Sequence, residues 1–465
     1  MAEKSKSEFG TCEKVWEITE TMQTIENARA LDRSKIDVLF NGARPYTKEE
    51  EEKHQIQINV NWGMGMRIMQ DANRQLNGAL LHSGTLFTAT LEQGRLDKRD
   101  EWSAEFTQLI HKPLQRGRSG KKQHYVIRSR NASICMHGIG ALLWTNGFRW
   151  NPRFIPLEDL LIPTDTYCDL SNLRFFAVNF YLTPGELIEM TQGKQVQKGW
   201  NMDMVNGLLE ENKSIFTEAS TSTWNSQPEA QQEIYKQNQG YYYSDAVPKI
   251  KLRYFYYQEI DNPGRWYRHV ILREAIGKVD TKKFLYDGSD NSFSDNIDQI
   301  LNVQYGDTSL VPPLKYHSVR GLGVPLFSPV ETLNRLQCEF IQHVFEQLKM
   351  YFRIQDPADR DRLKQVVLQQ YGFIPEGLNI VPREQRHQID GKLVEAAMNQ
   401  MRQITQENSS SFVQNTDSGT GKEMTAFEAK ARLNQANTMV SGMLAQIYAQ
   451  ETLDYEELVR RFCKK

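Results

Sequence analysis

A short run near the C-terminal end, GTGK at residues 419–422, has residue types that could bind a nucleotide phosphate. A phosphate-binding loop requires Gly, four residues and then Gly-Lys-Ser/Thr, because backbone amides surround the phosphates and a hydroxyl reaches the magnesium ion. Here Thr416 stands where the first Gly is required, and Glu423 replaces the hydroxyl residue with a carboxylate that would repel phosphate. The pattern therefore argues against nucleotide binding at this loop.

Other arrangements that carry catalysis are missing from the sequence or incomplete. It contains no HExxH pair of histidines for zinc and no GxSxG nucleophile elbow. The runs GIGALL at 138–143 and GLGVPL at 321–326 begin like dinucleotide-binding fingerprints but lack the third Gly. The acidic clusters at 295–298 and 359–361 stand in no specific pattern, which favours a solvated surface over a nuclease centre. We therefore predict no catalytic residue, no cofactor, no bound metal and no enzymatic activity.

The charge of the chain is nearly balanced. Its 56 Lys and Arg residues face 58 Asp and Glu residues, which leaves a formal net charge of -2. A domain that grips nucleic acid by neutralising phosphates is usually basic, so any contact with DNA is expected to be local or loose. Five scattered cysteines without a CxxC pair predict a reducing, cytosolic place of synthesis, and the lack of a long apolar run predicts no membrane segment.

Local patterns predict helices and a basic loop in the first quarter of the chain. The charged run TKEEEEKH at 47–54 is interpreted as a solvated helix face or a linker, and the apolar spacing over 55–78 predicts a helix. The segment KPLQRGRSGKKQ at 112–123 carries basic residues and no acid. This composition predicts an exposed basic loop, with contact to a phosphate backbone as the alternative.

Aromatic and β-branched residues predict a strand-rich region from 124 to about 290. The expected strands are HYVIRS, ALLWTNGFRW, RFFAVNFYL, KIKLRYFYYQEI and RWYRHVILREAI. In the fourth, apolar residues alternate with Lys249, Lys251 and Arg253, which predicts one buried face and one wet face. The turn residues DNPG at 261–264 predict a hairpin between the fourth and fifth strands.

Three capping boxes predict helix starts, at Thr183, Ser328 and Thr425. Each cap is followed three residues later by a glutamate, Glu428 in the last case, that reaches back to the cap amide. The helix after Ser328 is amphipathic over about twenty-four residues and is followed by the Asp-Pro break at 356–357. A short helix, a strand within FIPEGLNIVP at 373–382, a helix from about 392 and a polar Gly/Ser-rich loop then lead to the Thr425 helix.

The order of these elements resembles that of the portal (head-to-tail connector) proteins of tailed double-stranded DNA bacteriophages. Four stretches carry the likeness: RFIPLEDLLIPTDTYCDLSNLRFFAVNFYLTPGELIEM at 153–190, RGLGVPLFSPVETLNRLQCEF at 320–340, FIPEGLNIVP at 373–382 and GTGKEMTAFEA at 419–429. The likeness covers roughly residues 55–462 and is one of pattern and order.

The resemblance implies an α+β portal-type subunit in a ring oligomer. Its parts would be an N-terminal arm at 1–54, a mixed α/β wing at 55–326 that is strand-rich from about 123 to 290, stem helices at 327–352 and 388–410, a small α/β clip at 353–387, a tunnel loop at 411–424, a long channel or wing helix at 425–450, and the start of a crown or a C-terminal tail at 451–465.

The resemblance also implies a function without catalysis. Twelve copies would form a ring at one capsid vertex of the virion, assembled in the host cytoplasm, through which double-stranded DNA is packaged and ejected. The ring would contact the major capsid protein and scaffold, the terminase large subunit, and head-tail adaptor or tail proteins, and no membrane. The tunnel-loop residues expected to face DNA are Asn415, Asp417, Ser418, Thr420 and Lys422, and the clip residues expected to face terminase or adaptor are Arg353, Arg360, Arg362 and Lys364.

Two alternatives stay open from the sequence. The first is an enzyme that acts on nucleic acid, an ATPase or a nuclease, using the acidic clusters and the GTGK loop. The second is another ring-forming head-tail adaptor, although such adaptors usually have a much shorter chain.

Overall fold

The computed structural model describes most of the chain up to residue 348 and short parts beyond it. The described residues are 9–81, 98–116, 123–145, 152–192, 198–215, 250–261, 264–274, 282–289, 292–306, 314–348, 352–354, 378–380, 395–396, 398–400, 402–403, 447–461 and 463.

The fold is mixed α+β with small antiparallel sheets, which confirms the predicted fold class at that level. The helices are α1 (Cys12–Phe40), α2 (Lys48–His54), α3 (Met64–Leu81), α4 (Arg99–Arg116), α5 (Gln123–His137), α6 (Pro184–Gln192), α7 (Met202–Ile215) and α9 (Gly323–Leu348), and helical backbone covers 447–461. The strands are β1 (Ile139–Leu143), β2 (Arg153–Ile155), β3 (Leu160–Leu161), β4 (Phe175–Leu182), β5 (Ile250–Gln258), β6 (Trp266–Leu272), β7 (Leu301–Tyr305), β8 (Phe352–Ile354) and β9 (Leu378–Ile380).

Two antiparallel sheets form the body of the molecule. The strand order is β3-β4-β5-β6 in one and β2-β1-β7 in the other. β4 pairs with β5 from Phe175 opposite Tyr257 to Leu182 opposite Ile250. β5 and β6 pair as the hairpin predicted from the DNPG turn, and Gly264, the last residue of that turn sequence, has φ +103, a value that favours glycine.

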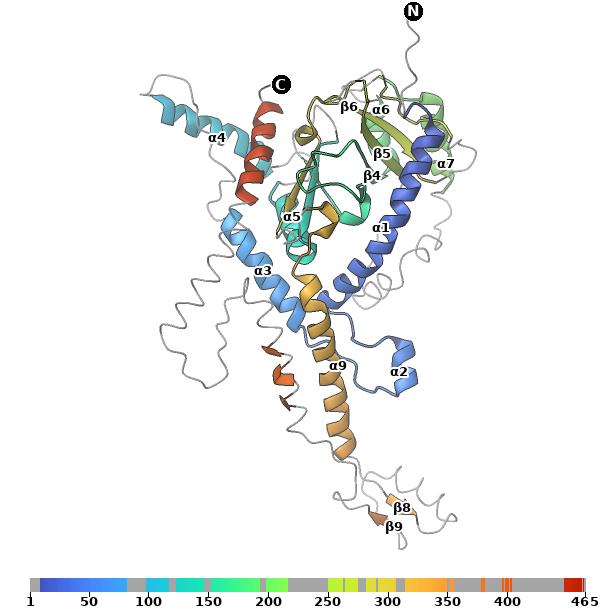
Figure 1. The fold of residues 1–465 in the computed structure, drawn as a ribbon, viewed down its shortest axis with the longest axis vertical. Coiled ribbons are helices and arrows are strands. Elements are labelled where there is room, and N and C mark those ends of the chain that lie inside the picture. The colour runs from blue at the N-terminus through green and yellow to red at the C-terminus, as the bar shows by residue number, and fades with distance from the viewer. Residues whose placement is uncertain are drawn as a thin grey trace, which may run out of the picture.

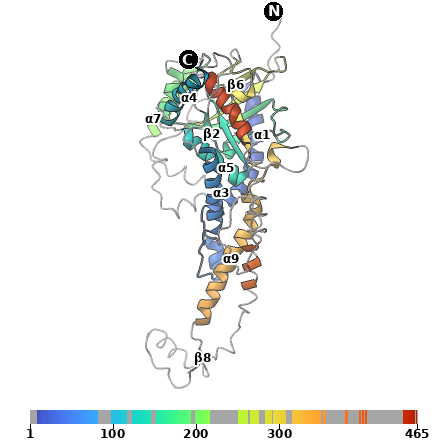
Figure 2. The same cartoon turned by 90° about the vertical axis from the view of Figure 1, so that its left-hand side faces the viewer.

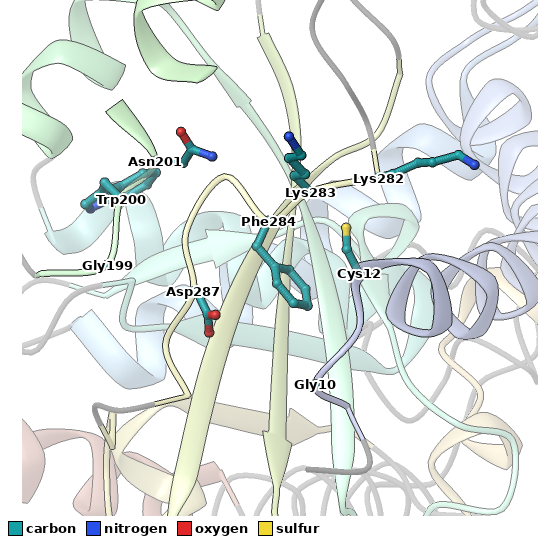
Figure 3. A pocket seen from close by; sticks show the side chains of 9 residues that line it. All are labelled: Gly10, Cys12, Gly199, Trp200, Asn201, Lys282, Lys283, Phe284 and Asp287. Carbon is teal, nitrogen blue, oxygen red and sulfur yellow. The ribbon is translucent and has the colours of Figure 1, made fainter. Parts of the chain in front are cut away.

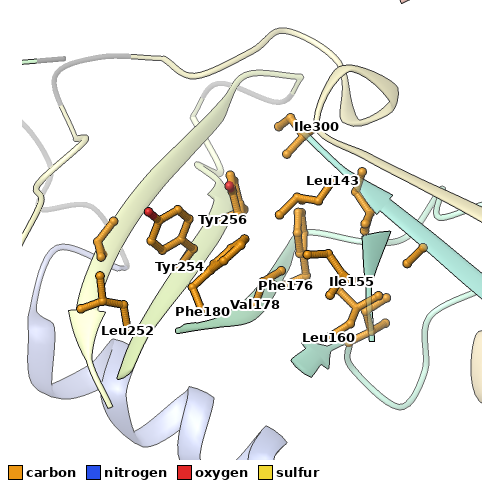
Figure 4. Packing of buried hydrophobic residues seen from close by; sticks show 14 of the residues in the cluster. Leu143, Ile155, Leu160, Phe176, Val178, Phe180, Leu252, Tyr254, Tyr256 and Ile300 are labelled. Carbon is orange, nitrogen blue, oxygen red and sulfur yellow. The ribbon is translucent and has the colours of Figure 1, made fainter. Parts of the chain in front are cut away.

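The two sheets share one hydrophobic core, part of which is drawn in Figure 4. Leu143 and Val303 from the three-stranded sheet belong to the same buried cluster as Phe176 and Tyr256 from the four-stranded sheet. Phe176 stacks on Tyr256 with ring centroids 4.8 Å apart and 10° between the planes. Burial of such rings removes large apolar areas from water, so this cluster is a main source of the body's stability.

Helix α1 covers the other face of the four-stranded sheet (Figure 1). Val15 and Met22 of α1 cluster with Phe255 and Tyr257 of β5. As a result the side chain of Arg253, predicted to face water, is 0% exposed. The prediction of a wet face on β5 is therefore wrong, because a helix more than two hundred residues upstream covers that face.

The strand predicted for HYVIRS at 124–129 is a helix in the structure, α5. Ile127, Arg130 and Ile134 are buried and recur at steps of three and four residues, which places them on one side of a helix. The β-branched residues of this segment favour a strand only weakly, and packing of this helical face overrides that preference.

The predictions for the first quarter of the chain are confirmed in part. α2 has no buried residue, as expected for a solvated helix. Four apolar residues carry the predicted spacing: Met69 and Leu76 of α3 are buried, Met66 of α3 is 36% exposed, and Trp62 precedes the helix and is 46% exposed. α4 extends to Arg116, so the first part of the expected basic loop is helical, and 117–122 lie outside the described residues.

Helix α9 begins before the predicted cap, at Gly323, and the cap assigned to Ser328 is wrong. Pro329 lies inside the helix and removes one backbone hydrogen bond, at a cost of about 3 kcal/mol in a helix interior. Leu326 and Val330 pack at a four-residue step into a second core with residues of α1, α3 and α5. Since each buried aliphatic side chain contributes about 1.5–3 kcal/mol, their burial offsets the proline and keeps the preceding turn helical.

The cap predicted at Thr183 is confirmed. The backbone N of Glu186 donates to Thr183 Oγ1 at 3.3 Å, and the backbone N of Thr183 donates to Glu186 Oε2 at 3.1 Å. This reciprocal pair satisfies two amides that the helix itself leaves without partners, and α6 begins at Pro184 as expected.

The described molecule is elongated. α9 leads away from the sheets, and the β8-β9 pair lies at the far end (Figures 1 and 2). The 26 residues of α9 correspond to roughly 39 Å of helix at 1.5 Å per residue. The helix at 447–461 lies back on the body, where Leu458 clusters with Ile110 of α4. The chain therefore leaves the body along α9 and is on the body again near its C-terminal end.

Two glycines lie in close contact where α9 joins the body. Gly138, which follows α5, has φ +85, and a Cβ there would lie 2.6 Å from the carbonyl carbon of Arg320. A Cβ on Gly321 would lie 2.5 Å from the carbonyl oxygen of Met136. The backbone that enters α9 is thus in direct contact with the backbone at the end of α5, and neither glycine position has room for a side chain.

We expect Gly138→Ala to lower the free energy of unfolding by about 3 kcal/mol or more. About 1–2 kcal/mol comes from the positive φ, and about 1–3 kcal/mol comes from the methyl group that must displace backbone. Gly42→Ala is the matched control, because Gly42 has φ +90 with nothing within 4 Å of the added Cβ. Urea denaturation of both variants measures the difference; equal losses would show that the backbone contact does not limit stability.

Candidate functional site

The predicted channel-facing residues lie outside the described residues. This applies to Asn415, Asp417, Ser418, Thr420 and Lys422 of the expected tunnel loop and to the expected helix cap formed by Thr425 and Glu428. It also applies to Arg360, Arg362 and Lys364 of the expected clip. Their roles stay predictions.

The structure describes some of the backbone around these segments. Arg353 lies in β8, opposite Asn379 of β9, and β9 confirms the strand predicted within FIPEGLNIVP. Short pieces of helical backbone between 395 and 403 agree with the helix predicted from about 392. The expected boundary at 450 falls inside the continuous helix at 447–461.

A shallow pocket lies near the N-terminal ends of α1 and α7 (Figure 3). Its lining residues come from segments 10–12, 199–201 and 282–287, and its volume is about 500 Å³. Lys282 Nζ lies 3.4 Å from Glu13 Oε1, and Lys283 and Asp287 also line the pocket. The lining thus carries charges of both signs, and one of its two lysines is paired with Glu13, so it does not form a cluster of free cations that would select an anion.

Neither a metal centre nor a membrane-spanning helix is found in the part of the chain that the structure describes. No three His, Cys, Asp or Glu side chains gather there in a way that could hold a metal ion. No helix there is both long enough and apolar enough to span a bilayer. Of the acidic cluster at 295–298, Asp295 lies 4.0 Å from Arg265 with both side chains largely exposed, which is a surface arrangement.

A buried histidine lies behind the pocket. The ring of His269 stacks on Phe284, which lines the pocket, at 4.1 Å and on Tyr257 at 4.8 Å. Its Nδ1 lies 3.4 Å from Asp287 Oδ1, and its side chain is 0% exposed. Burial lowers the pKa of His269 to about 4 although Asp287 acts in the opposite direction. The ring is therefore neutral at physiological pH and enclosed, which suits packing and not proton transfer to a substrate.

A second, half-buried histidine connects α1 to the rest of the body. Arg29 Nη1 lies 2.7 Å from His317 Nδ1, and His317 Nε2 lies 3.0 Å from the carbonyl oxygen of Ile162. Since the carbonyl can only accept, Nε2 carries the proton and Nδ1 accepts from Arg29. Burial, together with the neighbouring Arg29, lowers the pKa of His317 to about 4.

A buried guanidinium links α1 to the four-stranded sheet. Arg253 Nη1 donates to Thr19 Oγ1 and to Glu20 Oε1, each at 2.9 Å. Nε donates to Asn179 Oδ1 at 2.9 Å, and Nη2 donates to Gln23 Oε1 at 3.1 Å. A buried charge is tolerated when it is paired and hydrogen-bonded, so this network fixes α1 on β5. The sequence signal for it was a single arginine among aromatic residues of a strand.

The far half of α9 presents apolar side chains to solvent. Nearer the body, α9 is covered by the chain between α1 and α3: Tyr46 Oη donates to Glu339 Oε1 at 2.8 Å, and Gln57 N donates to Gln342 Oε1 at 3.0 Å. Beyond this cover, Val344 and Phe345 are 42% and 54% exposed. Adjacent exposed apolar side chains on a long amphipathic helix indicate a contact surface.

No protein-family model matches the sequence, and no curated protein matches it.

We expect the stability of His269→Phe to depend less on pH than that of the unchanged protein. The folded pKa of about 4 lies below the ordinary value of 6.5, so unfolded chains take up the proton first. The contribution of His269 is thus fully present above pH 6.5 and is lost as the pH falls toward 4, by up to about 1.4 kcal/mol per pH unit. Phe keeps the ring stack and cannot titrate.

Chemical denaturation at pH 5 and pH 7.5 measures this effect as a difference between the two proteins, in which the other titrating groups cancel. His54→Phe, at the exposed end of α2, is the control and should behave like the unchanged protein. Identical pH dependence of His269→Phe and the unchanged protein would contradict the assignment.

Proposed function

We propose that the protein is a bacteriophage portal subunit, which forms a ring at one vertex of the capsid and conducts double-stranded DNA during packaging and ejection. The observation that carries the proposal is helix α9, which joins the two-sheet body to the β8-β9 pair at the far end of an elongated molecule (Figure 1). Subunits drawn out along one direction can stand side by side around an axis and enclose a long passage. This arrangement supports a conduit more than a compact active site.

Closure of such a ring requires each subunit to contact its neighbours through two different surfaces. The exposed Val344 and Phe345 support this requirement, because packing against an adjacent subunit would remove them from water. On this proposal α9 is the first stem helix, and the segment at 388–410 supplies the second.

The proposed contact with DNA is weak because the charges of the loop that would face DNA are mixed in sign. The tunnel loop at 411–424 carries Asp417 and Lys422 of opposite sign, and the whole chain has a net charge of -2. Each fixed contact between a cation and a phosphate would have to break as DNA advances. A strongly basic channel, which binds phosphates tightly, would therefore oppose transport. A polar loop of mixed charge permits sliding.

The far end of the molecule is the proposed docking region for other machinery. The clip at 353–387 with β8, and with Arg353, Arg360, Arg362 and Lys364, would face the terminase large subunit and later a head-tail adaptor or tail protein. The body would face the major capsid protein and scaffold. The ring would act in the virion without catalysis of its own, and ATP hydrolysis would belong to terminase.

We expect the purified protein to form closed rings with a central hole. Twelve subunits of 54.0 kDa correspond to a particle of about 650 kDa, which mass photometry and negative-stain electron microscopy can identify. A population of monomers and dimers at high protein concentration would contradict the proposal.

We expect the double substitution Val344→Asp and Phe345→Asp to lower the yield of rings at least tenfold. Two carboxylates placed in a subunit contact would be desolvated without partners. Since both positions are exposed in the subunit, its melting temperature should change little. Ile260→Asp, at a 66% exposed position on the body, is the control. Rings of unchanged yield from the double variant would exclude this part of α9 from the subunit contact.

A further inference from the structure

The helix at 447–461 is held on the body by a buried polar cluster. Arg130 of α5 donates from Nη2 to Glu451 Oε1 at 2.5 Å, and its Nη1 lies 4.0 Å from Asp454 Oδ2. Asp454 also accepts from Asn302 Nδ2 at 2.5 Å and from Gln304 Nε2 at 3.0 Å. The side chains of Arg130, Glu451 and Asp454 are 1%, 6% and 5% exposed. Side chains of α5, β7 and the C-terminal helix thus meet where water is excluded.

The charges in this cluster do not balance if both acids are ionised. Glu451 is the nearer acid and forms the ion pair with Arg130. The amides of Asn302 and Gln304 orient their dipoles toward Asp454 but bring no charge. Because Glu451 and Asp454 share the single cation Arg130, an ionised Asp454 would leave the buried cluster with one uncompensated negative charge, which is strongly unfavourable. Burial raises the pKa of Asp454 to about 7, although Arg130 and the two amides act in the opposite direction.

The other groups around Asp454 supply no further compensation in the described part of the chain. Tyr455 is neutral, because burial and the nearby Glu451 raise its pKa far above the usual range. Arg461, on the same helix, is paired with Glu457 at 2.5 Å and donates to the carbonyl oxygen of Gln299 at 2.8 Å. From α4, Ile110 contributes an apolar contact with Leu458 of this helix.

The amide beside Asp454 can accommodate a proton on the carboxyl group. Gln304 Oε1 is buried and has no hydrogen-bond partner in the structure. Exchange of the N and O positions of this amide would bring Oε1 to face Asp454 Oδ2. A protonated Asp454 could then donate to Gln304 across the same 3.0 Å separation.

We propose that Asp454 takes up a proton when the C-terminal helix docks, so that the helix is held more tightly in mildly acid solution than above neutral pH. In the undocked helix the carboxyl group meets water, and its pKa returns to about 3.9. Between about pH 4 and pH 7 the docked form alone holds the proton. The stability of docking is therefore greatest at low pH, falls as the pH rises through this window, and is lowest above pH 7. This inference does not depend on the proposed function.

The test is hydrogen exchange, followed by mass spectrometry, of peptides covering 447–461 in the full-length protein at pH 5, 6, 7 and 8. In the unchanged protein the protection factors, corrected for intrinsic exchange, should fall by up to about tenfold per pH unit between pH 5 and 7. In Asp454→Asn, which keeps the size of the side chain and is neutral at every pH, the protection factors should be constant from pH 5 to pH 8. At pH 8 they should exceed those of the unchanged protein.

Two further variants distinguish the effect of protonating Asp454 from the effect of changed packing around the helix. Glu456→Gln removes an exposed carboxylate from the same helix and should leave the pH profile unchanged. Glu451→Gln leaves Arg130 to pair with Asp454, so the pKa of Asp454 should fall and the loss of protection should move to lower pH. A purely structural role of Glu451 would lower the protection without moving its pH dependence.

Two results would overturn the proposal. Protection of 447–461 that is independent of pH from 5 to 8 in the unchanged protein would mean that Asp454 does not exchange a proton on docking. Protection in Asp454→Asn that is lower than in the unchanged protein at pH 8 would mean that Arg130 holds an ionised Asp454. If Asp454→Asn does not fold, the pH profiles of the unchanged protein and of Glu451→Gln still test the proposal. A pH dependence in the unchanged protein that moves to lower pH in Glu451→Gln supports it, and a flat profile in the unchanged protein overturns it.

Discussion

The contact between Gly138 and Gly321 is the constraint on which the direction of α9 depends. Leu322 N donates to the carbonyl oxygen of Cys135 at 3.0 Å, and Gly306 N donates to the carbonyl oxygen of Gly138 at 2.9 Å. The end of α5, the end of β7 and the entry to α9 are therefore joined through backbone groups. Because both glycines lack a Cβ, α9 can start within hydrogen-bond distance of α5 and continue away from the sheets as one element.

Buried arginines make two further long-range connections within the body. Arg253 joins β5 to α1, and Arg130 joins α5 to the C-terminal helix, in each case over more than two hundred residues of sequence. A buried ion pair gives little net stability, since desolvation offsets most of the attraction. Its partners are nevertheless hard to replace, because an unpaired buried guanidinium would be strongly destabilising. These arginines thus specify which helix lies where, while the aromatic core supplies most of the stability.

Sequence patterns predicted the elements whose determinants are local. The hairpin of β5 and β6 follows from alternation and turn residues, and the start of α6 follows from the reciprocal bonds of Thr183 and Glu186. The predictions failed where distant packing decides. HYVIRS is helical because Val126 and Ile127 are buried on the same helix that carries Ile134 into a core cluster, and α9 begins before Ser328 because Leu326 is buried there. Of the candidate site, the strand β9 could be anticipated, whereas its partner β8 and the partners of Arg130 could not, since no spacing relates α5 to residues 451 and 454.

The C-terminal helix and α9 are connected through one core. Ile447 belongs to the cluster that contains Ile134 of α5, together with Leu322 and Leu326 at the start of α9. One turn further along the same helix, Glu451 binds Arg130, which is on α5 one turn before Ile134. The packing at the base of α9 and the ionisation of Asp454 therefore both involve α5 and the helix at 447–461. A change in how the C-terminal helix is held would alter the packing around Ile447, and this contiguous set of contacts is a physical route from the buried carboxyl group to the base of α9.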